Sequence, residues 1–273
     1  MAMELPEMTR IAGQLKKELF AKSFKELVFT DKVNKLTEWG FINLKQRDIT
    51  RSKITDVHSS GHYVFIDMES GFSLVFGDLV GKILYHSSQN ELPAKYTIAF
   101  ILSDDSALTF HTSLYGYVIA LSAEEIEEHK YIGHSGISPL DKKFTFDYFE
   151  RMLAASETQK AKKIQSLYDY MIGFQNGYFQ DILFCAKISP LRKIGDLMPK
   201  DRENLYNCLL EITKKAIAEN GSSDEMDIYG EHGHYRRIMG NHMKNQPCPR
   251  CGAPIVQKNI LGSNSYFCEK CQK

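Results

Sequence analysis

The sequence contains no long apolar run. No segment of the 273 residues approaches the ~18 consecutive apolar residues that a membrane-spanning helix needs. The first helix-like stretch, residues 1–20, is charged and amphipathic and lacks the apolar core of a signal peptide. We therefore expect a cytoplasmic protein without a membrane partner. No internal repeat or low-complexity tract is present either.

The sequence also lacks net charge, since 34 basic residues balance 34 acidic ones. This balance by itself does not favour nucleic acid. The distribution is uneven, however: residues 1–150 hold 16 Lys and Arg against 21 Asp and Glu, and residues 151–273 hold 18 against 13. A polyanion would be attracted first to the C-terminal part. A chance asymmetry of this size remains an alternative.

The N-terminal half predicts a helix followed by antiparallel strands. Apolar residues recur at helical spacing over 5–19, with Pro6 in the first turn and Lys16 and Lys17 near the end. Strand patterns then follow with turn signals between them, which favours an antiparallel sandwich or barrel. The expected strands are 62–68, 72–76, 96–102, 107–111 and 115–120.

The next region is predicted to be helical. A first helix follows Phe146, a second spans 158–172, and an apolar stretch from Asp181 to Ile188 ends before Pro190. A last helix spans 199–219 and ends at Asn220-Gly221, a good C-terminal cap signal. Residues 221–247 are polar and contain glycine, which predicts a linker or loop. At 43% hydrophobic residues, the chain is long enough for two domains with cores.

Four of the six cysteines form the most specific pattern in the sequence. Two C-x-x-C pairs, Cys248 with Cys251 and Cys268 with Cys271, are separated by sixteen residues. Each pair places two thiolates on one tight turn, so four sulfurs can surround one tetrahedral zinc ion that is structural because its coordination is complete. The segment between the pairs predicts a hairpin with its turn near Gly262. A disulfide pair or a redox C-x-x-C is the alternative.

The other two cysteines, Cys185 and Cys208, fall inside apolar helical stretches. This position predicts buried core thiols rather than ligands.

The order of these parts resembles the Fpg/Nei family of DNA glycosylases over essentially the whole chain. Several short motifs carry the resemblance. They are Glu4-Leu5-Pro6-Glu7, Gly61-His62-Tyr63-Val64, Ser138-Pro139-Leu140, Gly173-Phe174-Gln175-Asn176-Gly177-Tyr178, Ser189-Pro190-Leu191 and Cys271-Gln272.

The resemblance implies an α+β multidomain fold that holds damaged or abasic double-stranded DNA. Residues 1–135 would form a β-sandwich with a flanking helix, 136–222 a helix–two-turn–helix domain, and 223–273 a linker and the zinc finger. In the family the Asn of the two-turn element binds a phosphate, a role that falls to Asn176; a local turn cap is the alternative. The resemblance further implies a monomer associated with the nucleoid.

Family chemistry uses an N-terminal amine, usually of a proline directly before Glu-Leu-Pro-Glu. The amine attacks the sugar C1′, expels the base and forms a Schiff base, with a carboxylate assisting proton transfer. Glu4 and Glu7 match the family, but Met3 occupies the position of the proline. Removal of Met1 would leave a primary amine on Ala2, one residue and up to ~3.5 Å further out.

Three further positions depart from the family. Its loop lysine aligns with His62, which carries less charge at neutral pH. The arginine of the family's zinc finger aligns with Ser263, which cannot make a bidentate phosphate contact. Lys258 or Arg250 would have to compensate. The strand that fills the gap left by a flipped base reads Ser113-Leu114-Tyr115, where Tyr115 can wedge or stack. A solvated His62 and an ordinary strand aromatic at Tyr115 are the alternatives.

Two functions follow from these observations, and a third remains open. The first is an active glycosylase and AP lyase that uses the Ala2 amine with Glu4 as acid/base. The second is a catalytically inactive homologue that binds damaged DNA. The third is an unrelated structural or RNA-binding role.

Overall fold

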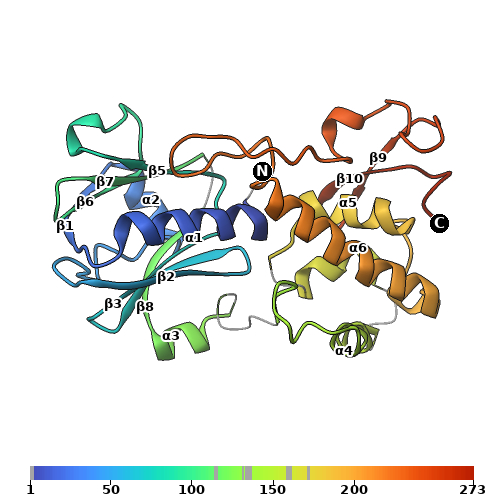
Figure 1. The fold of residues 1–273 in the computed structure, drawn as a ribbon, viewed down its shortest axis with the longest axis horizontal. Helices are drawn as coiled ribbons and strands as arrows, with labels where there is room; N and C mark the ends of the chain where they lie inside the picture. The colour runs from blue at the N-terminus through green and yellow to red at the C-terminus, as the bar shows by residue number, and fades with distance from the viewer. Residues whose placement is uncertain (1–2, 114–115, 131, 133–136, 158–161, 171–172) are drawn as a thin grey trace. The chain divides into compact units, whose positions relative to one another are not determined.

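The computed structural model describes residues 3–113, 116–130, 132, 137–157, 162–170 and 173–273 (Figure 1). The chain forms two compact units. The first contains residues 1–135 and 220–234, and the second contains residues 136–219 and 235–273. The finer division at residues 135 and 222 remains a prediction.

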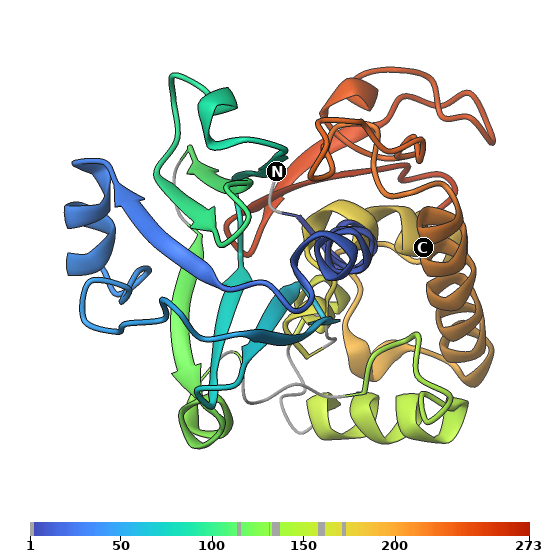
Figure 2. The same ribbon diagram turned by 60° about the vertical axis from the view of Figure 1, so that its left-hand side comes forward.

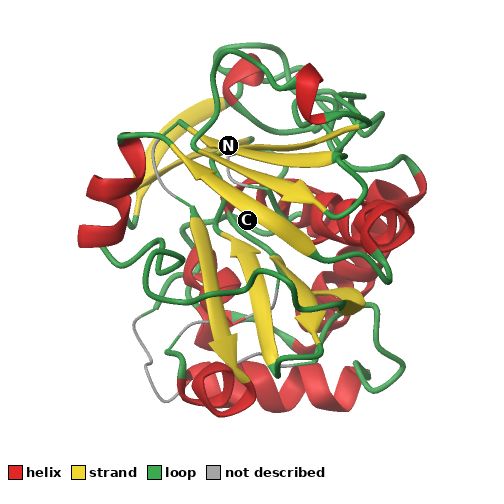
Figure 3. Cartoon of the chain, turned by 90° about the vertical axis from the view of Figure 1, so that its left-hand side faces the viewer, coloured by secondary structure: helices red, strands yellow, loops and turns green. Residues whose placement is uncertain are grey.

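The first unit is a sandwich of two antiparallel four-stranded sheets, seen as separate groups of arrows in Figure 3. One sheet has the order β1-β6-β7-β5 and the other β2-β3-β4-β8. Their strands are β1 (Phe24–Phe29), β6 (Ile98–Leu102), β7 (Ala107–Thr112), β5 (Gly81–His86), β2 (Ile54–Ser60), β3 (Tyr63–Met68), β4 (Phe72–Gly77) and β8 (Tyr117–Ser122). The expected sandwich is confirmed, while β1, β2 and β5 lie outside the predicted strand ranges.

One continuous core joins the two sheets. Phe76 on β4 lies with its ring centroid 5.9 Å from that of Phe100 on β6 and 6.0 Å from that of Phe110 on β7. All three side chains are fully buried. Burial of such aromatic side chains is the main favourable contribution to sandwich stability. Two short helices, α2 (Lys32–Glu38) and α3 (Ala123–Glu128), complete the unit between strands.

Helix α1 (Leu5–Leu19) has the predicted bounds and packs along β2 and β3 (Figure 1). Its predicted apolar positions are all buried. The carboxylate of Glu7 accepts a hydrogen bond from the backbone N–H of Glu4 at 3.0 Å, which satisfies a donor at the helix start. The sequence therefore specifies this helix locally as well as by its buried face.

Residues 220–234, within the predicted linker or loop, belong to the first unit and are bonded to it. The backbone N–H of Ser222 donates to Glu7 Oε1 at 2.7 Å, and that of Tyr85 donates to the carbonyl of Ile228. Ile228 is fully buried in the sandwich core. Gly221 has a φ of +84°, and a Cβ there would lie 2.9 Å from Glu7 Oε1. Some polar groups of this segment therefore have partners on α1, while others, such as Asp224 and His232, are exposed.

The second unit contains helices and one hairpin, with α5 and α6 side by side in Figure 2. Its elements are α4 (Phe146–Glu157), η2 (Ile164–Tyr170), α5 (Asn176–Ala186), η3 (Ile194–Asp196), α6 (Pro199–Ala218), η4 (Asn241–Met243), β9 (Val256–Ile260) and β10 (Ser263–Phe267). The helix expected over 158–172 is a 3-10 helix where the structure describes it. Helix α5 begins five residues before Asp181.

Cys185 on α5 and Cys208 on α6 form a disulfide, which corrects the prediction of buried core thiols; Cys208 is buried, but Cys185 is only partly buried. Their Cα atoms are 5.8 Å apart, a usual separation for such a bond. The apolar surroundings indicated burial, but only the packing of α5 against α6 brings the sulfurs together.

Candidate zinc centre and nucleic-acid interface

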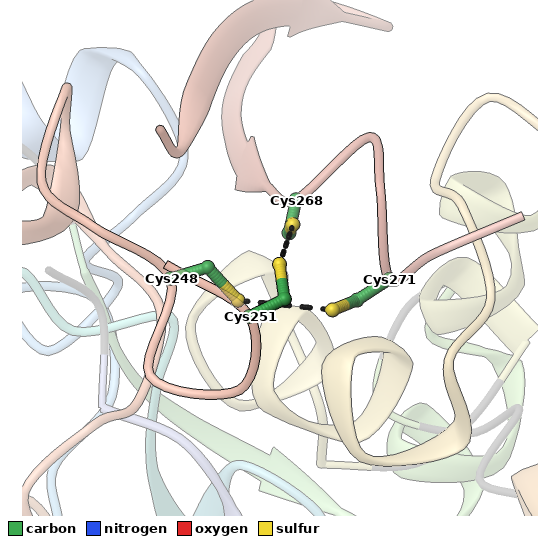
Figure 4. A group of neighbouring side chains, drawn as sticks. All are labelled: Cys248, Cys251, Cys268 and Cys271. Atoms are coloured by element: carbon green, nitrogen blue, oxygen red, sulfur yellow. Dashed lines mark hydrogen bonds between the residues drawn. The ribbon is translucent and has the colours of Figure 1, made fainter. Parts of the chain in front are cut away.

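The four predicted cysteine ligands converge at one point, as Figure 4 shows. Their sulfur atoms all lie within 4.8 Å of one another; Cys248 Sγ is 3.9 Å from Cys271 Sγ, and Cys251 Sγ is 3.6 Å from Cys268 Sγ. Zinc–sulfur bonds of about 2.3 Å place tetrahedral sulfurs ~3.8 Å apart. The cluster therefore fits one structural zinc ion. A hydrogen bond from the backbone N–H of Ala253 lowers the pKa of the Cys251 thiol to about 7, whereas burial raises the pKa of the Cys268 thiol and the neighbouring Cys251 raises that of Cys271.

The hairpin between the cysteine pairs also forms as predicted. Strands β9 and β10 pair in register, with Ile260 opposite Ser263 and Val256 opposite Phe267. The two turn residues, Leu261 and Gly262, have φ values of +53° and +84°. Positive φ at both positions is typical of the type I′ hairpin turn. Leu261 is 60% exposed at this tip.

Arg250, in the first cysteine pair, connects the zinc centre to α5. Its Nη1 donates to the carbonyl of Phe184 and its Nη2 to that of Cys185 at 3.3 Å, and the guanidinium carbon lies 4.2 Å from the Phe184 ring centroid. These carbonyls belong to the last turn of the helix, where a cation is favourable. Arg250 thus connects the zinc centre to the C-terminal end of α5.

Gln180 fixes the other side of the hairpin to α5. Its Oε1 accepts from the backbone N–H of Tyr266 on β10 at 2.7 Å, and its Nε2 donates to the carbonyl of Asn176 at 2.8 Å. The zinc finger is therefore joined to α5 at the middle of the helix, through Gln180, as well as at its C-terminal end, through Arg250.

Asn176 is the first residue of α5 and lies against the hairpin. Its Nδ2 donates to the backbone carbonyl of Asn264 at 2.8 Å, and its Oδ1 accepts from Gln165 Nε2 at 2.6 Å. The structure thus brings the predicted phosphate-binding Asn176 next to Ser263, the position of the family's finger arginine. Lys258, the other predicted finger contact, donates to Glu269 Oε1 at 2.7 Å.

Asp181 is a buried acid that sequence reasoning missed. It accepts hydrogen bonds from Tyr235 Oη and from the backbone N–H groups of Ile238 and Met239 at 2.9, 2.9 and 2.6 Å. Burial raises its pKa to about 6, against the opposing effect of these donors. A charged residue in the middle of an apolar helix was the available signal. Asp181 holds the segment that leads into the zinc finger.

At the N-terminus, Met3 is fully buried and its backbone N–H donates to the carbonyl of Leu79 at 3.1 Å. Glu4 and Glu7 are also buried. Both carboxylate oxygens of Glu7 accept backbone N–H groups, as described for α1 and for residues 220–234. Ala2 lies outside the described residues. The catalytic assignments at this end remain predictions.

His62 lies at the edge of the same unit, 21% exposed by its side chain. Its Nε2 is 3.2 Å from Asp78 Oδ1, and its ring centroid is 4.3 Å from that of Tyr63. Tyr63 Oη donates to the second oxygen of Asp78. The phosphate role of His62 remains a prediction, and that of Tyr115 falls outside the described residues.

Comparison with known proteins agrees with these features. A family model described as "Zinc finger found in FPG and IleRS" matches residues 245–273. Formamidopyrimidine-DNA glycosylase of Pelotomaculum thermopropionicum is 28% identical over 231 residues, which are 82% of this chain and 83% of that protein. The enzyme of the same name from Mycoplasma genitalium is 28% identical and covers 99% of this chain and 95% of its own. The chain is thus similar to formamidopyrimidine-DNA glycosylases over nearly its whole length, and to their zinc finger at its C-terminal end.

Solved Fpg structures have the same fold. The MutM (Fpg) protein of Thermus thermophilus matches with a TM-score of 0.83 and 22% identity over 98% of each chain. The Lactococcus lactis Fpg in complex with DNA containing an abasic site matches with a TM-score of 0.84 and 21% identity over 99% of each chain. Among the described residues, no helix is both long and apolar enough to cross a membrane.

Proposed function

We propose that this protein recognises damaged or abasic sites in double-stranded DNA as a DNA glycosylase and AP lyase of the base-excision type. The arrangement of Asn176 against the zinc hairpin carries the proposal, because it presents a side-chain amide beside an ordered turn. The names of the relatives, and the abasic DNA bound by the Lactococcus lactis protein, support the same substrate class.

The chemistry would use the amine of Ala2 after removal of Met1. The amine nitrogen bonds to the sugar C1′ while the bond from C1′ to the base breaks, and the base leaves with a proton; ring opening then gives a Schiff base that permits strand elimination. Glu4 would transfer protons in these steps. Because the Met3 nitrogen is a buried amide bonded to Leu79, it cannot supply this nucleophile.

The test is borohydride trapping on duplexes that carry an abasic site or an oxidised base, with mass spectrometry of the intact N-terminus. We expect a reduced covalent adduct that maps to Ala2. As a matched comparison, a variant lacking Ala2 and carrying Met3→Pro restores the family's N-terminus and should form more adduct. If neither protein forms a covalent adduct on any of several different lesions, the proposed lyase chemistry is contradicted.

A second candidate is a damaged-DNA-binding protein without glycosylase activity. The specific observation in its favour is the buried Met3 amide at the family's nucleophile position. A one-residue displacement of the amine is large, since a misplacement of ~1 Å can cost ~100-fold in rate. This candidate predicts salt-sensitive binding to an abasic duplex without product.

The proposal also covers the oligomeric state and the cellular location of the protein. We infer a monomeric protein of the cytoplasm that associates with the nucleoid. Analytical ultracentrifugation of the zinc-loaded protein and fluorescence localisation in cells test these two statements.

A further inference from the structure

Gln165 is a buried amide with no role in the family resemblance. It lies in η2 with none of its surface exposed, and its Nε2 donates to Asn176 Oδ1 at 2.6 Å. Its own Oε1 is buried and has no hydrogen-bond partner among the described residues. A buried amide that leaves one atom unsatisfied is unusual, since most buried polar atoms are paired. The orientation of this amide, with its nitrogen towards Asn176 and its oxygen unpaired, therefore requires an explanation.

The explanation lies in the direction of the hydrogen bonds. A side-chain amide can present either its oxygen or its nitrogen to a ligand. Here the backbone carbonyl of Asn264 only accepts, so the amide nitrogen of Asn176 must face it. The oxygen of Asn176 then faces Gln165, which must donate. The described contacts use one of the two N–H groups of Asn176 Nδ2, and the other can only donate to an acceptor.

We propose that Gln165 is a positioning residue that holds Asn176 as a hydrogen-bond donor towards a DNA phosphate. This inference rests on the proposed DNA-binding function and deepens it. The contact is then made through neutral amides, at the place where Ser263 stands instead of a cation. A neutral donor releases no counterion, so its loss weakens binding without changing the dependence on salt.

The first experiment introduces a carboxyl group with Gln165→Glu. At pH 8 the carboxylate only accepts, so it repels Asn176 Oδ1 and competes for the amide nitrogen. We expect affinity for a duplex with a tetrahydrofuran abasic analogue to fall roughly tenfold, as for loss of a bond to a charged group. On acidification the neutral carboxyl donates again, and affinity should return towards that of the wild type. The hydrogen-bond partners of Gln165 and Asn176 do not titrate.

The second experiment measures the salt dependence of the same affinity. Asn176→Ala should weaken binding roughly tenfold and leave the slope of log K against log salt unchanged, whereas loss of a cation contact changes it by about 0.9. Gln165→Glu should have no further effect in the Asn176→Ala background. Gln257→Glu on β9 controls for added negative charge, and it should weaken binding at pH 8 less than Gln165→Glu does. Gln165→Met, which cannot donate, should weaken binding at every pH.

The outcomes distinguish the positioning role of Gln165 from the proposed DNA-binding function. If the wild-type protein binds the abasic duplex and Gln165→Glu binds equally at pH 8, the positioning role is wrong while the proposed function stands. The positioning role is also overturned if Gln165→Glu lowers the affinity for DNA equally in the wild-type and in the Asn176→Ala background, because equal effects indicate a general structural change. If the zinc-loaded wild-type protein binds no such duplex, both are overturned.

Discussion

Replacing Arg250 by alanine should loosen the zinc finger from α5. The substitution removes two hydrogen bonds to helix carbonyls and the stacking of the guanidinium on Phe184. A hydrogen bond of this kind contributes about 1 kcal/mol at an exposed site, the longer one less, and the stacking about 0.5–1 kcal/mol. We therefore expect a loss of about 2 kcal/mol in the free energy of unfolding of the second unit.

Urea unfolding of zinc-loaded protein, followed by far-ultraviolet circular dichroism, measures this loss. Release of zinc to a chromogenic chelator should become faster in parallel, because the cysteine pair loses its attachment to α5. The chain's single tryptophan, Trp39, lies in the first unit, so its fluorescence transition should shift less. Arg250→Lys keeps a cation near the helix end but lacks the planar guanidinium. It should lower the free energy of unfolding by about half as much as Arg250→Ala does.

Lys200→Ala is the matched control. Lys200 also belongs to the second unit, but its side chain is 74% exposed and pairs with Glu203 on the same helix. Such surface pairs contribute at most about 0.5 kcal/mol. An Arg250→Ala protein that unfolds at the wild-type urea concentration, or one that loses no more stability than Lys200→Ala, would refute the attachment of the finger through Arg250.

Three further changes test other parts of the second unit. Chelation of zinc should remove hydrogen-exchange protection from β9 and β10 and abolish binding to an abasic duplex, since metal binding supplies much of the folding energy of such hairpins; unchanged affinity of the metal-free protein would contradict this. Asp181→Asn should cost about 2–3 kcal/mol, because an amide nitrogen then opposes backbone donors. In the wild type, the raised pKa of Asp181 means that stability falls as pH rises from about 4 to about 6; unfolding free energies over this range should show that slope only with Asp181 present. Leu261→Asn should raise the unfolding free energy by about 0.5–1 kcal/mol, because asparagine accepts the positive φ of the turn more readily; a lower melting temperature would count against the turn assignment.

Features specified by neighbouring residues could be predicted from the sequence. The bounds of α1 follow from a helical repeat with a proline at its start, and the zinc hairpin follows from two cysteine pairs around a Gly-containing turn. In both, the residues that determine the structure lie within a few positions of the residues they order. Local patterns of this kind are also the most reliable sequence signals.

Features that depend on tertiary pairing could not be predicted. The disulfide joins Cys185 to Cys208 across 23 positions, and its formation depends on the packing of two helices. Gln165 meets Asn176 only because η2 folds back against the start of α5. The polar segment 220–234 carries the composition of a linker, yet its backbone makes hydrogen bonds with Glu7 on α1 and with Tyr85 on β5.

The N-terminal motif shows why a family resemblance does not by itself establish catalysis. Glu7 has a structural role, because its two oxygens accept hydrogen bonds from the start of α1 and from the segment at Ser222. Its presence would therefore be expected in an active and in an inactive member alike. In the proposed chemistry the nucleophile comes from the residues before Met3, whereas Asn176 and the zinc hairpin belong to another unit of the chain. On that proposal binding and cleavage depend on different residues, and a protein that binds abasic DNA without forming the borohydride adduct is physically possible.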